Sequence, residues 1–221
     1  MGRSSRTLGA ALALLGLLMV AGCAGGSSAT DREVVSGVSV HDTDNLHGIV
    51  LPRAYRVPDV RLEDVHGRPY DLARAATGPL TLVYFGYTHC PDTCQVVMAN
   101  LASAMTRLDA TQRRQVRTVF ITTDPQRDTA ATLRGYVARF DPTFEGATGP
   151  MRSIVRLGKA VGVPIARGAK LPSGGYDVSH GTQVLGVVHG GRVPYVWTEG
   201  TAPSALADDI TTILDGKVRS E

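Results

Sequence analysis

Apolar residues gather in two short uninterrupted runs near the middle of the chain, Leu80–Gly86 and Val116–Thr122. Both runs are rich in β-branched or aromatic side chains, which predicts strands buried on both faces. Two further apolar runs, Thr182–His189 and Arg192–Trp197, flank Gly190-Gly191. Paired glycines favour a tight hairpin turn, so we expect these two runs to form antiparallel neighbours.

Between the strands, apolar residues recur every three or four positions, which predicts amphipathic helices. The clearest helix is Asp92–Leu108, and Pro91 suits its start because the missing N–H costs nothing there. Its predicted buried face consists of Cys94, Val97, Leu101, Met105 and Leu108. Further helices are predicted at Asp128–Phe140, Met151–Val161 and Ser204–Leu214. In Met151–Val161 the residues expected to face inward are Ile154, Val155 and Gly158.

These elements follow one another in the order strand, helix, strand, helix, helix, hairpin, helix. This order predicts an α/β fold with a mixed central sheet and helices on both faces. It matches the thioredoxin-like fold with one helix inserted before the final hairpin. A loose alternation from Val57 to Tyr70 around Gly67 adds an N-terminal β-hairpin, whereas Phe144–Gly149 is expected to be short and irregular.

Residues 1–22 predict a signal peptide rather than part of the fold. Arg3 and Arg6 precede an apolar run, Leu8–Val20, whose 13 residues fall short of the roughly 20 needed to cross a bilayer. The run ends in Val20-Ala21-Gly22-Cys23, which resembles a bacterial lipobox. We therefore expect cleavage before Cys23 and lipidation of that cysteine. An ordinary signal peptide followed by an incidental cysteine is the alternative.

Residues 23–51 begin with small and polar side chains and show no period. This predicts a flexible tether between the lipid and a domain at residues 52–221. We therefore expect a lipid-anchored protein of the cell membrane whose domain faces the extracytoplasmic side. His41 and His47 belong to this polar stretch, and we expect them to be solvated rather than to bind a metal.

Composition and charge narrow the class of protein. Of the 221 residues, 43% are hydrophobic and 19% are charged, which is typical of a globular protein. The formal net charge of +3 gives no reason to expect a nucleic-acid partner. Three cysteines exclude a disulfide-rich scaffold, and once Cys23 is lipidated only Cys90 and Cys94 remain.

Cys90 lies at the mouth of the helix predicted for Asp92–Leu108, and Cys94 lies one turn inside it. Side chains four apart on a helix face the same way, so the two sulfurs could share a metal ion or form a disulfide. The positive end of the helix dipole favours thiolate, which both uses require. Oxidoreductases of this fold usually carry Cys-x-x-Cys, whereas three residues intervene here. A metal would need a third ligand, for which histidine is the best candidate type.

Three segments carry a more specific signal: Tyr84-Phe-Gly-Tyr-Thr-His-Cys-Pro-Asp-x-Cys94, Phe120-Ile-Thr-Thr-Asp-Pro-Gln-Arg-Asp-Thr129 and Tyr176-x-Val178-x-His180. In this order they resemble the SCO/SenC family of copper proteins, over roughly residues 57–216. The resemblance implies a thioredoxin-like fold, a membrane-anchored domain, and copper held by two cysteines and one histidine. Carried over by motif, the ligands are Cys90, Cys94 and His180.

The chain departs from the family pattern after the predicted histidine ligand. Gly181-Thr182 follows His180 where many members have a serine, and the next strand ends in Val187-Val188-His189 rather than in an acidic turn. We therefore expect the final hairpin to differ in shape from that of the family.

Three polar residues are expected around the metal ligands rather than among them. His89 adjoins Cys90, but adjacent side chains on a tight turn diverge. Asp92 either complements the helix dipole or tunes the pKa of the thiols. Asp124 is expected to cap a turn with Pro125, at the edge of the sheet where the site should lie.

The resemblance implies a copper chaperone that supports assembly of the dinuclear copper centre of cytochrome c oxidase, with the oxidase subunit carrying that centre as partner. Oxidation of Cys90 and Cys94 to a disulfide would remove two ligands, so redox state could gate metal loading. The alternative is an extracytoplasmic thiol–disulfide oxidoreductase that maintains the cysteines of the oxidase copper site. Against it stand the longer cysteine spacing and the lack of a proline directly before Thr182–His189.

Overall fold

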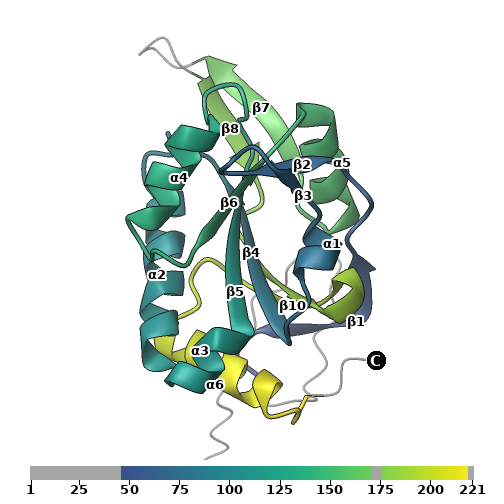
Figure 1. Ribbon diagram of the computed structural model, residues 1–221, viewed down its shortest axis with the longest axis vertical. Helices are drawn as coiled ribbons and strands as arrows, with labels where there is room; N and C mark the ends of the chain where they lie inside the picture. The colour runs from purple at the N-terminus through teal and green to yellow at the C-terminus, as the bar shows by residue number, and fades with distance from the viewer. Residues whose placement is uncertain (1–45, 171–175, 219–221) are drawn as a thin grey trace, which may run out of the picture. The chain divides into compact units, whose positions relative to one another are not determined.

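A central sheet of eight strands organises the protein in the computed structural model, which describes residues 46–170 and 176–218. The strands lie in the order β1-β10-β9-β4-β5-β6-β2-β3, as Figure 1 shows for most of them. The bounds of these strands are β1 Ile49–Arg56, β2 Leu62–Asp64, β3 Pro69–Tyr70, β4 Leu80–Gly86, β5 Val116–Thr122, β6 Glu145–Thr148, β9 Val184–Val188 and β10 Arg192–Trp197.

The two apolar runs form neighbouring parallel strands at the centre of this sheet. β4 pairs with β5 from Leu80↔Val116 to Gly86↔Thr122, and β6 extends the parallel set on the far side of β5. The other pairings within the sheet are antiparallel. Because β4, β5 and β6 are parallel, their carboxyl ends reach the same edge of the sheet.

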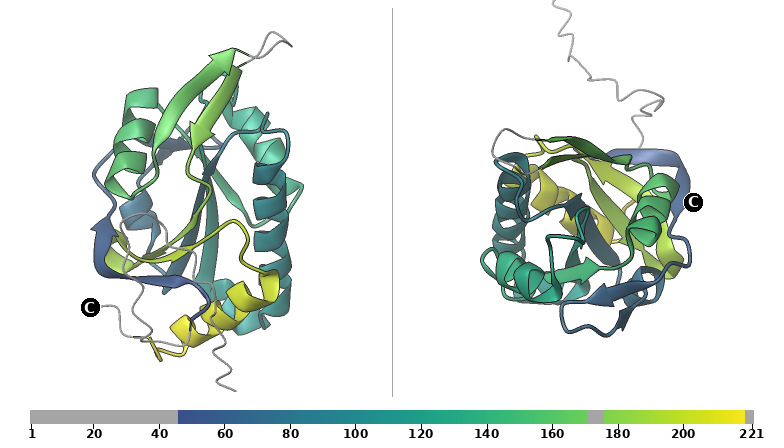
Figure 2. Two further views of the ribbon diagram at one scale, coloured as in Figure 1. Left: turned by 180° about the vertical axis from the view of Figure 1, so that it is seen from behind. Right: turned by 90° about the horizontal axis from the view of Figure 1, so that it is seen from above.

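Helices cover both faces of the sheet, which confirms the predicted α/β class and the thioredoxin-like arrangement (Figure 2). Leu82 and Tyr84 of β4 pack with α2, α4 and α6, whereas Val83 and Phe85 pack with α1 and α5. The bounds of the helices are α1 Leu72–Ala75, α2 Thr93–Arg107, α3 Ala110–Gln115, α4 Ala130–Ala138, α5 Met151–Ala160 and α6 Pro203–Leu214. Among the described residues, none of these helices is long and apolar enough to span a membrane.

A second, two-stranded sheet consists of β7 Ile165–Lys170 and β8 Tyr176–His180. The strands are antiparallel, and Ile165 pairs with His180 at the base of the hairpin. Figures 1 and 2 show the hairpin beyond the carboxyl ends of β4 and β5. This hairpin was not predicted, and it places the last residue of β8 above the edge of the main sheet.

Several expectations from the sequence need correction. The segment Phe144–Gly149 was expected to be irregular, but it contains β6. Its residues have no strong preference for a strand, and the strand forms because it pairs with β5 on one side and β2 on the other. Val155 was placed on the inner face of α5 but is 38% exposed, and Leu157 is buried instead. β1 begins at Ile49, within the segment assigned to the tether.

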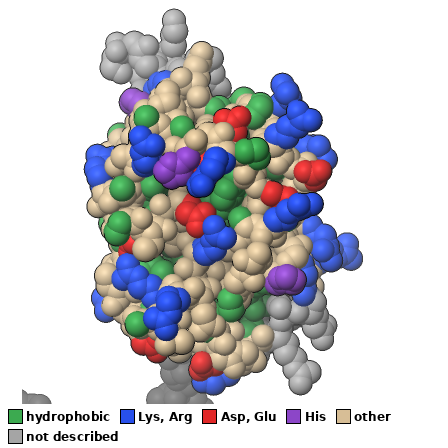
Figure 3. Space-filling view, in the orientation of Figure 1, with side chains coloured by type: hydrophobic (Ala, Val, Ile, Leu, Met, Phe, Trp, Pro, Cys, Tyr) green, Lys and Arg blue, Asp and Glu red, His purple; other side chains and the backbone are tan. Residues whose placement is uncertain are grey.

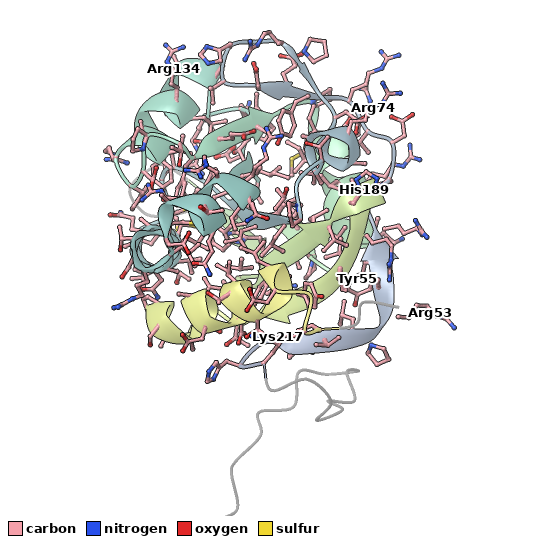
Figure 4. The ribbon with its side chains drawn as sticks, turned by 60° about the horizontal axis from the view of Figure 1, so that its bottom comes forward. Arg53, Tyr55, Arg74, Arg134, His189 and Lys217 are labelled. Carbon is pink, nitrogen blue, oxygen red and sulfur yellow. The ribbon has the colours of Figure 1, made fainter. Side chains whose placement is uncertain are left out.

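The predicted hairpins are present. β2 pairs with β3 around Gly67, and β9 pairs with β10 around a 3-10 turn, His189–Gly191. Gly190 and Gly191 both have positive φ, at 75° and 71°, which explains the paired glycines. His189 lies in this connection and is exposed (Figure 4).

On the face shown in Figure 3, basic and acidic side chains are interspersed.

Candidate metal and thiol site

The two cysteines lie where β4 gives way to α2, at the carboxyl edge of the parallel strands. After Gly86 the chain forms a turn in which the Cys90 N–H donates to the Tyr87 carbonyl at 3.1 Å. Helix α2 then begins, with Asp92 accepting a hydrogen bond from the Thr93 N–H at 2.5 Å. Asp92 therefore acts as the N-cap, which is the first of the two roles considered for it.

Both cysteines are free thiols, and they differ in environment. Cys90 is 8% exposed and Cys94 is fully buried. The Cys90 sulfur accepts a hydrogen bond from the Cys94 N–H at 3.3 Å, as expected for a residue at the mouth of a helix. The Cys94 sulfur also faces Gly86, where an added Cβ would lie 3.0 Å from it. Glycine is thus needed at position 86 to leave room for the thiol.

The two thiols have opposite pKa shifts. The hydrogen bond from the Cys94 thiol lowers the pKa of Cys90 to about 6, assisted by the backbone N–H groups of Cys94 and Asp92 and opposed by burial. The shared hydrogen bond and burial raise the pKa of Cys94. The lowered pKa of Cys90 favours its thiolate, and the raised pKa of Cys94 favours its protonated form.

His180 ends β8 and brings its ring to the buried thiol. Its Nδ1 lies 2.9 Å from the Gly181 carbonyl, and because a carbonyl can only accept, Nδ1 carries the proton. In the neutral ring Nε2 then carries the lone pair, and it lies 3.7 Å from the Cys94 sulfur. His180 is the last residue of a strand that the sequence did not predict, and it pairs with Ile165.

The spacing of Cys94 and His180 fits a shared metal ion. A metal about 2.3 Å from sulfur and about 2.0–2.1 Å from nitrogen separates these ligands by about 3.5–3.6 Å at a tetrahedral angle and about 3.7–3.8 Å at a trigonal angle. The observed 3.7 Å falls within the trigonal range. Among the described residues, no three His, Cys, Asp or Glu side chains already form a closed metal cluster. Cys94 and His180 thus lie at the spacing of two ligands of one metal ion. Cys90 lies next to them, because its sulfur accepts a hydrogen bond from the Cys94 N–H.

Two tyrosine rings contact the histidine edge-on. The rings of Tyr84 and Tyr87 lie 6.2 and 6.0 Å from the His180 ring between centroids. Within the part of the chain that the structure describes, the buried Tyr84 hydroxyl has no partner at hydrogen-bonding geometry, yet it lies close enough to Cys94 to lower the pKa of that thiol. The sequence analysis assigned no role at the site to Tyr84 or Tyr87. The position of Tyr84 at the end of a fully buried strand was the available signal.

Asp128 holds the turn that carries Cys90, and the sequence analysis missed this role. Asp128 does not cap the following helix, because the N-cap of α4 is Thr129. Its carboxylate accepts hydrogen bonds from the Thr88 N–H at 2.9 Å and the Thr88 hydroxyl at 2.6 Å. His89 lies beside this group, with Nδ1 3.6 Å from Asp128 and 3.1 Å from the Thr88 hydroxyl.

Asp124 lies in the turn after β5 and connects to the histidine through two side chains. It is buried and forms an ion pair with Arg127. The Arg127 guanidinium lies over the Tyr87 ring at 5.6 Å, and that ring contacts His180. The backbone carbonyl of Asp124 also accepts from the Arg127 and Asp128 N–H groups, which fits the expected turn.

Cys23, the predicted site of lipidation, lies outside the described residues.

Comparison with known proteins gives a consistent result. The model of the SCO1/SenC family matches residues 55–215. A relative from Stutzerimonas stutzeri, described as copper-binding, is 32% identical over 164 residues, or 74% of this chain and 76% of that protein. Against mitochondrial SCO2 homologues from cattle and zebrafish, the match spans half or less of the relative's length.

Solved structures share the fold. Copper-bound ScoI from Bradyrhizobium japonicum is 26% identical with a TM-score of 0.64, covering 72% of this chain and 99% of that one. BsSco is described as having a disulfide switch and as a member of the Sco family of cytochrome c oxidase assembly proteins. It is 22% identical with a TM-score of 0.59, covering 76% of this chain and 97% of that one.

Proposed function

This chain belongs to the SCO1/SenC family, and from this premise we propose that it is a copper chaperone whose ligands are Cys90, Cys94 and His180. Its partner is the cytochrome c oxidase subunit that carries the dinuclear copper centre. The observation that carries the proposal is the approach of His180 Nε2 to the Cys94 sulfur, with Nδ1 already engaged by Gly181. The copper-bound structure from Bradyrhizobium japonicum and the relative from Stutzerimonas stutzeri support copper as the metal.

The three side chains suit copper in both of its common oxidation states. Thiolate sulfur is a soft ligand that favours Cu(I), and imidazole also accepts Cu(II). The lowered pKa of Cys90 favours its thiolate, so the main cost of deprotonation on metal loading falls on Cys94, whose pKa is raised. Cys90 keeps some exposure while Cys94 has none, which makes Cys90 the ligand through which metal enters and leaves.

The N-terminal segment sets where this chemistry takes place. A signal peptide at residues 1–22 and lipidation of Cys23 would anchor the protein in the cell membrane. A tether ending near residue 51 would then carry the domain of residues 52–221 on the extracytoplasmic side. Metabolic labelling with a fatty acid tests the anchor, because Cys23→Ala should lose the label that the wild type carries.

A thiol–disulfide oxidoreductase is the second candidate, and the asymmetry of the two thiols favours it. The Cys90 thiolate would attack one sulfur of a partner disulfide, forming a mixed disulfide and releasing the other partner sulfur as a thiolate. Cys94, after losing its proton, would then attack Cys90. This forms the Cys90–Cys94 disulfide and frees the second partner thiolate. His180 has no role in this sequence.

Copper retention by the full chain in detergent tests the proposal and separates the two candidates. The reduced protein is given copper, freed of excess metal, and analysed for copper per chain. The wild type should retain about one equivalent, and Cys90→Ser, Cys94→Ser and His180→Ala should each retain much less. His189→Ala, in the exposed connection between β9 and β10, is the control and should bind like the wild type. Disulfide exchange that survives His180→Ala in a protein without copper affinity would favour the oxidoreductase.

A further inference from the structure

We propose that Asp128 is the positioning residue of this site: it clamps Thr88 and so fixes Cys90 relative to Cys94 and His180. The inference rests on the proposed function for its copper readout, but its geometry stands without the metal. Both oxygens of the Asp128 carboxylate accept hydrogen bonds from Thr88, one from the N–H and one from the hydroxyl. Thr88 is the residue two before Cys90 in the turn that delivers the thiol.

The clamp joins two segments that are far apart in the sequence. Asp128 lies 40 residues after Thr88, in the turn between β5 and α4. One carboxylate oxygen also accepts from the Thr122 hydroxyl at 2.8 Å, at the end of β5. The Asp128 N–H donates to the Asp124 carbonyl at 2.9 Å. Asp128 is therefore held in place by the end of β5, and it in turn holds Thr88 and the turn that carries Cys90.

The rest of the Cys90 turn is anchored at its two ends and by the Tyr87 ring, which contacts Arg127 and His180. At the start, Thr123 donates to the Gly86 carbonyl from its N–H at 2.6 Å and from its hydroxyl at 3.1 Å. At the end, helix α2 fixes Cys94 in its first turn. Cys90 lies between these anchors, and a shift of the turn would move its sulfur relative to the Cys94–His180 pair. The Asp128 clamp acts on this intermediate part.

The helix does not explain why an aspartate is buried here. The N-cap of α4 is Thr129, whose hydroxyl accepts from the Thr132 N–H at 3.2 Å. Asp128 has no exposed surface, and burial of a carboxyl group is unfavourable unless hydrogen bonds compensate. Its hydrogen bonds are directed to the Cys90 turn and to the strand beside it. The Asp128 side chain thus accepts hydrogen bonds from the turn that carries Cys90 and does not cap the helix that follows it.

A matched control exists at the opposite edge of the sheet. Asp141 is also buried, and one of its oxygens accepts from the Thr143 N–H at 2.8 Å and from the Thr143 hydroxyl at 2.6 Å. This second Asp–Thr clamp lies just before β6, at the amino ends of the parallel strands. Asp128→Asn and Asp141→Asn therefore both disturb a buried Asp–Thr clamp, and only the first lies at the thiols. Asp141→Asn also weakens the ion pair of Asp141 with Arg113, so it is the more demanding control for a loss of stability.

The experiment compares these two variants with Thr88→Val and Thr88→Ser in the full chain in detergent. Copper affinity is measured by competition with a chelator, and the thiolate-to-copper absorption band is recorded. In the metal-free protein, the Cys90–Cys94 couple is titrated in glutathione buffers. Loss of groups that orient metal ligands typically lowers metal affinity about 10–100-fold, and we expect this for Asp128→Asn and Thr88→Val. Both should also alter the absorption band and the midpoint of the glutathione titration.

Thr88→Ser keeps the hydroxyl and should restore near wild-type values, and Asp141→Asn should change stability alone. If Asp128→Asn fails to fold, Thr88→Val carries the test, because it retains the carboxylate. The proposal is overturned if Asp128→Asn or Thr88→Val matches Asp141→Asn in both copper affinity and thiol titration. If the wild type retains no copper, the proposed function fails, and the titration of the metal-free thiols still decides the role of Asp128.

Discussion

The Nε2 atom of His180 lies 3.7 Å from the sulfur of Cys94, although 86 residues separate them in the chain. Cys94 lies at the carboxyl edge of the sheet because the turn after β4 leads into α2. His180 lies there because β8 ends above the same edge. The Gly181 carbonyl holds Nδ1 and leaves Nε2 as the acceptor. Two side chains from distant segments are therefore already aligned, which reduces the ordering that binding a metal between them would have to supply.

The reactivity of Cys90 should follow its lowered pKa. The thiol titrates near pH 6 because the Cys94 thiol and backbone N–H groups donate to it, so its thiolate fraction rises through pH 6 and is nearly complete by pH 8. Alkylation by iodoacetamide, followed by mass spectrometry, should show that rise for Cys90 and little modification of buried Cys94. An inflection near the ordinary thiol value of about 8.5 would contradict this assignment. Cys94→Ala should move the inflection upward, because it removes the donor.

Gly86→Ala should damage the site directly. An added Cβ would lie 2.8 Å from the Phe120 ring and 3.0 Å from the Cys94 sulfur, so both must shift. Overpacking of this kind costs about 1–3 kcal/mol in the free energy of unfolding, and copper retention should fall as well. Denaturant unfolding and copper per chain are the measurements.

Gly135→Ala is the control for that substitution. It lies within α4, where an added Cβ meets no atom within 4 Å. Alanine in an open helical position should stabilise the protein by about 0.5–1 kcal/mol and leave copper retention unchanged. Wild-type behaviour of Gly86→Ala in both assays would show that the thiol is not confined as described.

Asp209→Ala should separate stability from metal binding. This buried carboxylate accepts hydrogen bonds from the His47 and Gly48 N–H groups and from the Trp197 indole, at 2.7–2.9 Å. Its removal leaves these donors without their partner and should lower the free energy of unfolding by about 1–3 kcal/mol. Below the unfolding transition, copper retention should equal that of the wild type. A parallel loss of copper would mean that the metal site depends on global stability rather than on its local contacts.

The sequence predicted the central part of the fold because that part is encoded locally. β4, β5 and α2 have clear runs or periods, and their buried faces agree with the pattern, as Leu82, Val97 and Leu101 illustrate. β6 was missed because its residues, Glu-Gly-Ala-Thr, favour no strand by themselves and become one through pairing on both sides. β1 pairs with β10, some 140 residues later in the chain, and its residues give no comparable local signal.

The candidate site shows the same division between local and distant information. Position at a helix N-terminus indicated reactive thiols at Cys90 and Cys94, whereas His180 was identified only through the family resemblance. The hydrogen bonds from Thr88 to Asp128 were not predictable from the sequence, because the two residues lie 40 positions apart. Local patterns relate Asp128 only to neighbours such as Thr129. Contacts between distant segments thus position this site, and they become visible only in three dimensions.

The most direct test of the account is the X-ray absorption spectrum of the Cu(I)-loaded full chain, recorded for the wild type and for His180→Ala. The account predicts two sulfur ligands at about 2.3 Å and one nitrogen at about 2.0 Å in the wild type. In His180→Ala the nitrogen should be lost and the sulfurs retained on whatever copper remains. A wild-type spectrum with sulfur ligands alone, or a nitrogen shell that persists in His180→Ala, would contradict the assignment of Cys90, Cys94 and His180 as the copper ligands.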